Sequence, residues 1–163
     1  MMMAVTLKRY YGEEKTYLVY DVVKNEYAID SKRARVICDP RYGIGCDGII
    51  MGPYHEKDGI HMAILNPDGS ETAASYEAMC VFARYLKDNA YVEKKYVPIH
   101  TKGDFVIASY LNEAATHIRL SKGKEIFVSD ETMREDEFIL NGDVGYIGTT
   151  TLGYEFLAKL DSL

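Results

Sequence analysis

The stretch from Glu71 to Asn89 (ETAASYEAMCVFARYLKDN) constrains the fold more than any other part of the chain. It contains no glycine or proline and is rich in residues that favour helices. Met79, Phe82 and Leu86 recur at helical spacing, but the remaining faces are also largely apolar. A helix on a protein surface keeps one polar face, whereas a helix that is apolar nearly all round must be enclosed by other elements. The sequence therefore predicts a buried central helix over about residues 71–89.

The remainder of the chain favours short strands, separated by turn sequences. β-Branched and aromatic residues predict strands at Thr16–Val23, Ile49–Met51, Ile60–Leu65, Tyr96–Ile99, Asp104–Leu111, Thr116–Leu120 and Glu125–Val128. Gly52-Pro53 is expected to break the strand before it. Turns are expected at His55–Asp58, at Asn66–Ser70 and at Lys122-Gly123-Lys124. Because helices do not alternate with strands, the predicted class is α+β and not a doubly wound sheet.

Predictions for three further segments follow from local signals. Ser31–Asp39 is expected to form a short helix that starts on Ser31 as N-cap, buries Ala34, Ile37 and Cys38, and ends at Pro40. The acidic run Ser129–Glu137 is predicted to be a solvated loop, with Asp130–Glu137 as an acidic connector. Tyr154–Leu160 is expected to form one or two helical turns.

Composition limits the kinds of partner. The chain carries 19 basic and 25 acidic residues, a net charge of −6. This balance argues against nucleic acid and anionic lipid as partners, since both attract positive fields. Nothing approaches the roughly 20 apolar residues of a membrane span. The first residues, MMMAVTLKRYYGEE, lack the pattern of a signal peptide. The reduced cytoplasm is the expected compartment.

Cysteine and histidine usage gives no sign of a structural metal. The three cysteines, Cys38, Cys46 and Cys80, form no CxxC pair, and the four histidines lie far apart in sequence. No zinc-type spacing is present, so no metal site is expected. Gly43, Gly45 and Gly48 punctuate one loop, but no long helix follows them, which disfavours a phosphate-binding loop.

Three stretches of the sequence carry a family resemblance. ARVICDPRYGIGCDGIIM (residues 34–51), followed by NPDGSE (66–71) and FARYLKD (82–88), resembles the amino-terminal domain of diaminopimelate epimerases over roughly residues 5–120. These are amino-acid racemases and epimerases that work without pyridoxal phosphate, in the lineage of lysine biosynthesis. The resemblance implies a curved mixed β-sheet wrapped around one buried central helix, in a domain spanning 1–120. Residues 121–163 would be part of a second domain or an extension, and no cofactor is expected.

The family's chemistry, as the resemblance implies it, uses one cysteine at the start of each domain's central helix. One cysteine removes the α-proton of the substrate, which lies in the cleft between the domains, and the other returns a proton from the opposite face. A helix N-terminus lowers a thiol pKa, which makes the thiolate available. The cysteine is followed by Gly-Asn-Gly, whose backbone N–H groups bind the substrate carboxylate.

This sequence departs from that motif. Counting from Asn66 places Ser75 at the cysteine position and Tyr76-Glu77-Ala78 at Gly-Asn-Gly. A serine without a partner base is too weakly acidic to abstract an α-proton. Glu77 puts a negative charge where a carboxylate should bind. No catalytic residue is therefore expected to be intact, and the predicted substrate-binding residues are Asn66, Ser75, Tyr76 and Glu77.

The same segment has plainer interpretations, and there are other departures. Ser75 also suits a helix cap, Asn66 suits any tight turn, and Cys46 and Cys80 suit packing. In the family's Gly-x-Gly-Asn-Asp motif, the asparagine is replaced here by Lys15. The sequence ends at Leu163, before a second central helix and its cysteine would be expected.

The functional prediction is an isomerase lineage, weak or inactive as a single chain. Any surviving activity would be proton exchange at an amino-acid α-carbon, and the expected ligand is an amino-acid-like small molecule. The alternative is a non-catalytic module that binds a small ligand or completes itself with a partner, by self-association or with a complementary chain. A truncated product of a decayed gene is a third possibility.

Overall fold

The computed structural model describes residues 4–11, 15–25, 29–129, 134–141, 146–147 and 156–157. The two helices in these ranges are α1 (Ser31–Cys38) and α2 (Tyr76–Asp88). The strands are β1 (Ala4–Tyr11), β2 (Thr16–Asp21), β3 (Gly48–Glu56), β4 (Gly59–Leu65), β5 (Glu71–Thr72), β6 (Tyr96–Thr101), β7 (Asp104–Tyr110), β8 (Ile118–Lys122), β9 (Glu125–Ser129), β10 (Arg134–Asn141), β11 (Tyr146–Ile147) and β12 (Phe156–Leu157). Neither described helix has the length and apolar character needed to cross a membrane.

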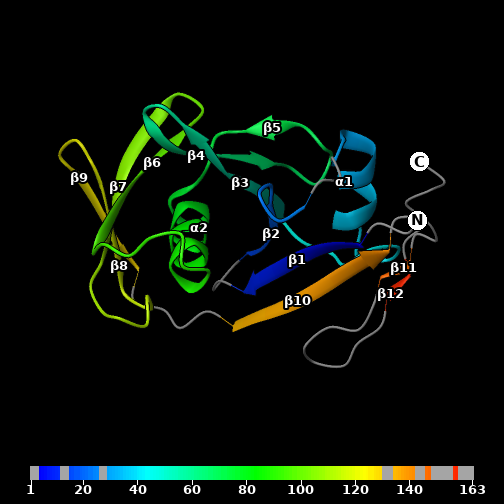
Figure 1. Ribbon diagram of the computed structural model, residues 1–163. Helices are drawn as coiled ribbons and strands as arrows, with labels where there is room; N and C mark the ends of the chain where they lie inside the picture. Colours follow the sequence, from blue (N-terminus) through cyan, green and yellow to red (C-terminus); the bar gives the residue numbers. More distant parts are fainter. Residues whose placement is uncertain are drawn as a thin grey trace.

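The strands form one mixed sheet. Their order is β12-β11-β10-β1-β2-β3-β4-β6-β7-β8-β9, and β5 pairs separately with β4. The β2–β3 and β4–β6 pairs are parallel, whereas the other pairs are antiparallel. α2 packs against β2 and β3 and also against β8 and β9, so strands lie on both sides of it (Figure 1). The α+β class with a mixed sheet is confirmed.

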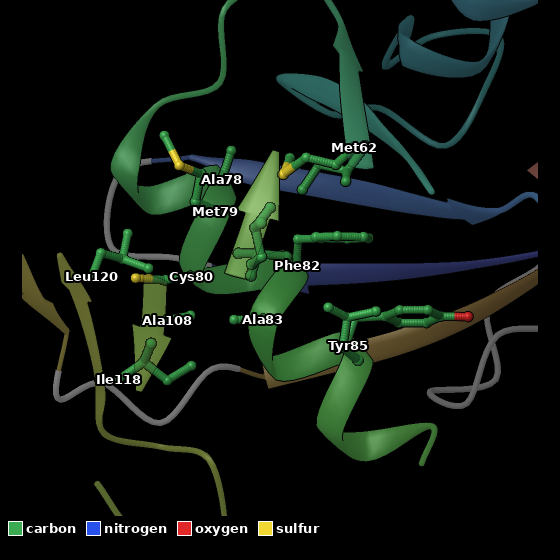
Figure 2. Packing of buried hydrophobic residues seen from close by; sticks show 14 of the residues in the cluster. Met62, Ala78, Met79, Cys80, Phe82, Ala83, Tyr85, Ala108, Ile118 and Leu120 are labelled. Carbon is green, nitrogen blue, oxygen red and sulfur yellow. The ribbon is translucent and has the colours of Figure 1, made fainter. Parts of the chain in front are cut away.

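The apolar character of α2 is matched by its surroundings. Ala78, Met79, Cys80, Val81, Phe82, Ala83, Tyr85 and Leu86 are all buried. Figure 2 shows Cys80 and Ala83 facing side chains of β7 and β8, while Phe82 and Tyr85 point the other way. Each large side chain enclosed in this way contributes about 1.5–3 kcal/mol to folding. This burial on several faces explains why the segment has no broad polar side.

α2 begins later than the sequence predicted. Glu71 and Thr72 pair with Leu65 and Ile64 of β4, so the first residues of the expected helix are strand β5. Ser75 has extended backbone angles and acts as the N-cap. The segment up to Ser75 has no strong helix breaker, and its strand pairing is a tertiary effect that local propensity does not reveal.

α1 confirms the expected short helix, with a different cap. Asp30, not Ser31, is the N-cap, and its carboxylate accepts a hydrogen bond from the backbone N–H of Arg33. Ala34, Ile37 and Cys38 are buried as predicted, and the helix ends before Pro40. Gly43 lies directly against its last turn, where a Cβ would come within 2.0 Å of the carbonyl oxygen of Val36. The glycine loop therefore packs against this helix.

The expected break at Gly52-Pro53 is wrong, and the turn predicted over 55–58 is confined to residues 57 and 58. β3 continues through to Glu56, and its register with β4 shifts between Met51 and Tyr54. The irregularity lets the strand pass close to the central helix: a Cβ on Gly52 would lie 2.9 Å from the ring of Phe82. Glycine serves close approach here, not chain termination.

The ends of the chain contain strands that the sequence did not predict. β1 pairs with β10 from Ala4↔Asn141 to Tyr11↔Arg134, so the loop predicted over 129–137 is wrong at both ends: Ser129 lies in β9 and 134–137 in β10. Residues 130–133 lie outside the described residues. Phe156–Leu157 form β12 where a helical turn was expected, and the rest of 154–160 also lies outside them. The predicted boundary between a domain over 1–120 and a second part over 121–163 falls within β8. This domain boundary stays a prediction.

Candidate functional site

Ser75 lies where β5 gives way to α2, and its side chain is exposed. Its Oγ accepts a hydrogen bond from the backbone N–H of Ala78 at 3.1 Å. The hydroxyl of Tyr17, on β2, lies 3.2 Å from the same oxygen. Neither partner can take a proton from serine at neutral pH. The plainer interpretation of Ser75, as a helix cap, is therefore confirmed.

Two backbone N–H groups in the first turn of α2 donate hydrogen bonds to Ser75. Its side chain binds the N–H of Ala78, and its carbonyl oxygen accepts from the N–H of Met79 at 3.0 Å. Glu77 is half-buried in the first turn, where the helix dipole favours a negative charge. In the family motif this first turn binds the carboxylate of the substrate. Here the side chain of Glu77 supplies a carboxylate in the same turn.

Tyr76 connects the helix start to the β8–β9 hairpin. Its hydroxyl donates to the carboxylate of Glu125 at 2.6 Å, and its ring stacks on Phe127 at a centroid distance of 5.4 Å. The hydrogen bond to Glu125 raises the pKa of Tyr76 above its ordinary value. Beside it, Lys122 Nζ lies 2.7 Å from Asp104, a contact that raises the pKa of Lys122. Sequence reasoning missed these partners, because only the register of β8 and β9 places them there.

Asn66 lies in the turn between β4 and β5. Its backbone N–H donates to the carbonyl of Ser70 at 2.7 Å, and its amide nitrogen donates to the Ser70 hydroxyl at 3.1 Å. Asp68 accepts from both the backbone N–H and the hydroxyl of Ser70, which lowers the pKa of Asp68. Ser75, Tyr76 and Glu77 are thus consecutive at the helix start, whereas the hydrogen bonds of Asn66 hold its own turn together. A substrate role for Asn66 stays a prediction.

None of the three cysteines lies at the start of α2. Cys80 is buried one turn further along the helix, with a fully enclosed side chain. Cys38 and Cys46 lie together at the end of α1, with their sulfurs 3.0 Å apart. Hydrogen bonding to Cys38, together with burial, raises the pKa of the Cys46 thiol well above its ordinary value. A raised pKa keeps the thiol protonated and weakly nucleophilic.

An open hollow of about 530 Å³ lies at the far end of α2. It is lined by residues that follow the helix and by β6, among them Tyr91, Glu93, Lys94 and Tyr96. Thirteen helical residues, about 20 Å, separate that end of α2 from Ser75. This hollow is therefore distinct from the position that the family motif indicates.

Comparisons with known proteins agree on the family. The diaminopimelate epimerase family profile matches residues 9–128. Diaminopimelate epimerase 2 of Nostoc sp. is 32% identical over 122 residues, which cover 74% of this chain and 42% of that protein. The diaminopimelate epimerase of Methanocella arvoryzae is 28% identical over 131 residues, with 77% and 46% covered.

Solved structures share the fold. A methylitaconate-delta-isomerase matches with a TM-score of 0.54 at 14% identity, covering 85% of this chain and 72% of that one. A Bacillus anthracis protein of the phenazine biosynthesis PhzF family matches with a TM-score of 0.52 at 13% identity, covering 74% and 40%. The chain spans about half the length of the curated relatives it matches. From the profile match and the Nostoc relative, the chain belongs to the diaminopimelate epimerase family.

Proposed function

We propose that this chain recognises an amino-acid-like small molecule at the start of α2 but does not, by itself, exchange the α-proton of that molecule. The observation that carries the proposal is the set of hydrogen-bond partners of the Ser75 hydroxyl. At the position of the family's cysteine, its hydroxyl caps the helix and contacts a tyrosine hydroxyl. Proton abstraction at carbon needs a base, and neither partner supplies one.

The charges at the helix start also differ from what the family's reaction needs. Glu77 lies in the first turn, and the carboxylate of Glu125 accepts a hydrogen bond from the hydroxyl of Tyr76, the residue before Glu77. A substrate carboxylate about 4 Å from another carboxylate is repelled by roughly 1 kcal/mol in water, and by more when water is excluded. The same carboxylates attract an ammonium group. An amino-acid-like ligand would therefore bind by its ammonium end, with Asn66, Ser75 and Tyr76 as polar neighbours.

Thiol alkylation tests the acid–base part of this proposal. In the folded wild-type chain, Cys38, Cys46 and Cys80 are expected to react slowly with iodoacetamide up to about pH 8. Cys38 and Cys80 are buried, and the pKa of half-buried Cys46 is raised. Ser75→Cys is expected to add one fast-reacting thiol, since position 75 is exposed and at a helix N-terminus. Mass spectrometry of peptides after timed alkylation measures each site.

The matched control is Ser70→Cys, an exposed position in the preceding turn without a helix behind it. It should react with the pH dependence of a thiol whose pKa is at or above the ordinary value of about 8.5, because the carboxylate of Asp68 lies beside this position. A wild-type cysteine that reacts as fast as Cys introduced at position 75 would contradict the proposal. It would show that the chain already holds a thiolate able to accept a proton.

A partner-completing module is the second candidate, favoured by the exposed outer side of β9. This strand ends the described sheet, and Ile126 and Val128 are 65% and 53% exposed. An edge strand with apolar side chains offers unpaired backbone groups to another chain. Sedimentation velocity should then show concentration-dependent association that Ile126→Asp weakens. A monomer at every concentration, for both proteins, would contradict self-association through this edge.

A further inference from the structure

Two histidines and an aspartate meet where the turn between β3 and β4 lies beside the end of β6. The side chains of Asp58, His61 and His100 each offer one donor atom, and these atoms lie within 4.8 Å of one another. Asp58 is exposed, and the two histidines are half-buried. Figure 1 shows the β3–β4 turn next to the turn that follows β6. The histidines are far apart in sequence, so a search for ligand spacing does not reveal this group.

The backbone holds the histidines together. β4 and β6 are parallel, with His61 paired directly to His100, so both side chains point to the same face of the sheet. Their rings stack at a centroid distance of 4.5 Å and an angle of 11°. The ring of Phe105, on β7, packs against His100 at 4.7 Å. Neighbouring strands therefore position both imidazoles before any ligand binds.

Each histidine ring turns one nitrogen that could bind a metal toward Asp58. His100 Nε2 lies 3.0 Å from the backbone carbonyl of Asp58 and must donate to it, because a carbonyl only accepts. The neutral ring then carries its lone pair on Nδ1, which lies 3.8 Å from Asp58 Oδ2. His61 Nε2 lies 2.6 Å from Asp58 Oδ1 and donates to it, so this ring must carry its proton on Nδ1 when Nε2 binds a metal. A histidine that binds a metal through one ring nitrogen usually donates a hydrogen bond from the other nitrogen, often to a backbone carbonyl.

We propose that Asp58, His61 and His100 form a binding site for a divalent transition-metal ion, with zinc as the ion that fits best. Zinc lies about 2.0–2.2 Å from imidazole nitrogen and carboxylate oxygen, so two donors on one tetrahedral ion are roughly 3.4 Å apart. The separations of 2.6 and 3.8 Å lie on either side of that value. Two imidazoles and one carboxylate suit zinc better than magnesium or calcium. Exposure of Asp58 leaves the fourth position open to water.

Zinc titration of the full chain, purified without a histidine tag and monitored with a competing chromophoric chelator, tests the site. The wild-type chain is expected to bind one zinc ion. His61→Ala and His100→Ala should each weaken binding by roughly tenfold or more, because each removes a ligand. His117→Ala is the control: its ring contacts Asn112 in another loop, and the variant should bind zinc like the wild type.

Asp58→Asn provides a milder variant, because residue 58 lies in an exposed turn and the change keeps its shape. It should also weaken zinc binding while circular dichroism shows an unchanged fold. Cobalt gives an independent readout: the intense visible absorption of tetrahedral Co²⁺ should appear with the wild-type chain and be lost in His61→Ala. Wild-type affinity weaker than roughly 1 mM would overturn the proposal. Equal zinc affinity in the wild type, His61→Ala and His100→Ala would overturn it as well.

Discussion

Asp21→Ala is expected to destabilise the folded chain by about 3 kcal/mol or more. Asp21 ends β2 and is 2% exposed. Its carboxylate accepts hydrogen bonds from the hydroxyls of Tyr85 at 2.5 Å and Tyr91 at 2.8 Å. It also accepts from the backbone N–H groups of Val23 and Lys24. Alanine would leave these four donors without their acceptor. Water can reach the N–H groups of exposed Val23 and Lys24. The hydroxyls of Tyr85 and Tyr91, however, are buried and half-buried, and each buried group left unsatisfied costs roughly 1–3 kcal/mol.

The carboxylate of Asp21 connects distant parts of the chain. Tyr85 lies on α2 and Tyr91 follows it, so the hydrogen bonds attach the end of β2 to the C-terminal part of the central helix. Burial raises the pKa of Tyr91, and the hydrogen bond to Asp21 adds to the effect. The phenol therefore keeps its proton and remains a donor. Loss of this connection should loosen the sheet and the helix together.

Urea unfolding measured by circular dichroism checks the prediction, with Asp68→Ala as the matched control. Asp68 also accepts hydrogen bonds from its own turn, but it is exposed, so water replaces the lost acceptor. Its replacement should cost less than about 1 kcal/mol. If Asp21→Ala were no more destabilising than Asp68→Ala, the four hydrogen bonds to Asp21 would not contribute to stability as described.

The features of the fold that could be predicted were those with a strong local pattern. The apolar faces of the 71–89 segment required an enclosed helix, and Ala34, Ile37 and Cys38 showed the buried face of α1. The features that were missed depend on partners remote in sequence. β5 forms because it pairs with β4. β1 pairs with β10, whose first residues belong to a segment predicted to be an acidic loop. Such pairings are tertiary and override local propensity.

The candidate site divides in the same way. Motif spacing placed Ser75, Tyr76 and Glu77 at a helix start, where the structure has them. Spacing could not show that Tyr17 contacts Ser75 or that Glu125 binds Tyr76, because these partners come from β2 and β9. It also led to the expectation of no metal site, whereas the parallel register of β4 and β6 brings His61 and His100 together. Strand register is not encoded in the spacing of ligand residues.

The other large expected effect concerns catalysis. Enzymes typically accelerate their reactions by a millionfold or more. A chain with no base to take the α-proton is expected to lose the acceleration of that step. Incubated with diaminopimelate in deuterium oxide, this chain should not raise the rate of α-proton exchange above that of a protein-free sample. Ser75→Ala should behave identically, since the Ser75 hydroxyl caps the helix and is not expected to take a proton. The epimerase of Nostoc sp. serves as the positive control.

Proton NMR of diaminopimelate in deuterium oxide, with and without the wild-type chain, is the most direct test of the absence of α-proton chemistry. With the wild-type chain present, the intensity of the α-proton signal is expected to stay the same over hours as in the protein-free sample. A loss of that signal that grows with the concentration of the chain and disappears on heat denaturation would contradict it.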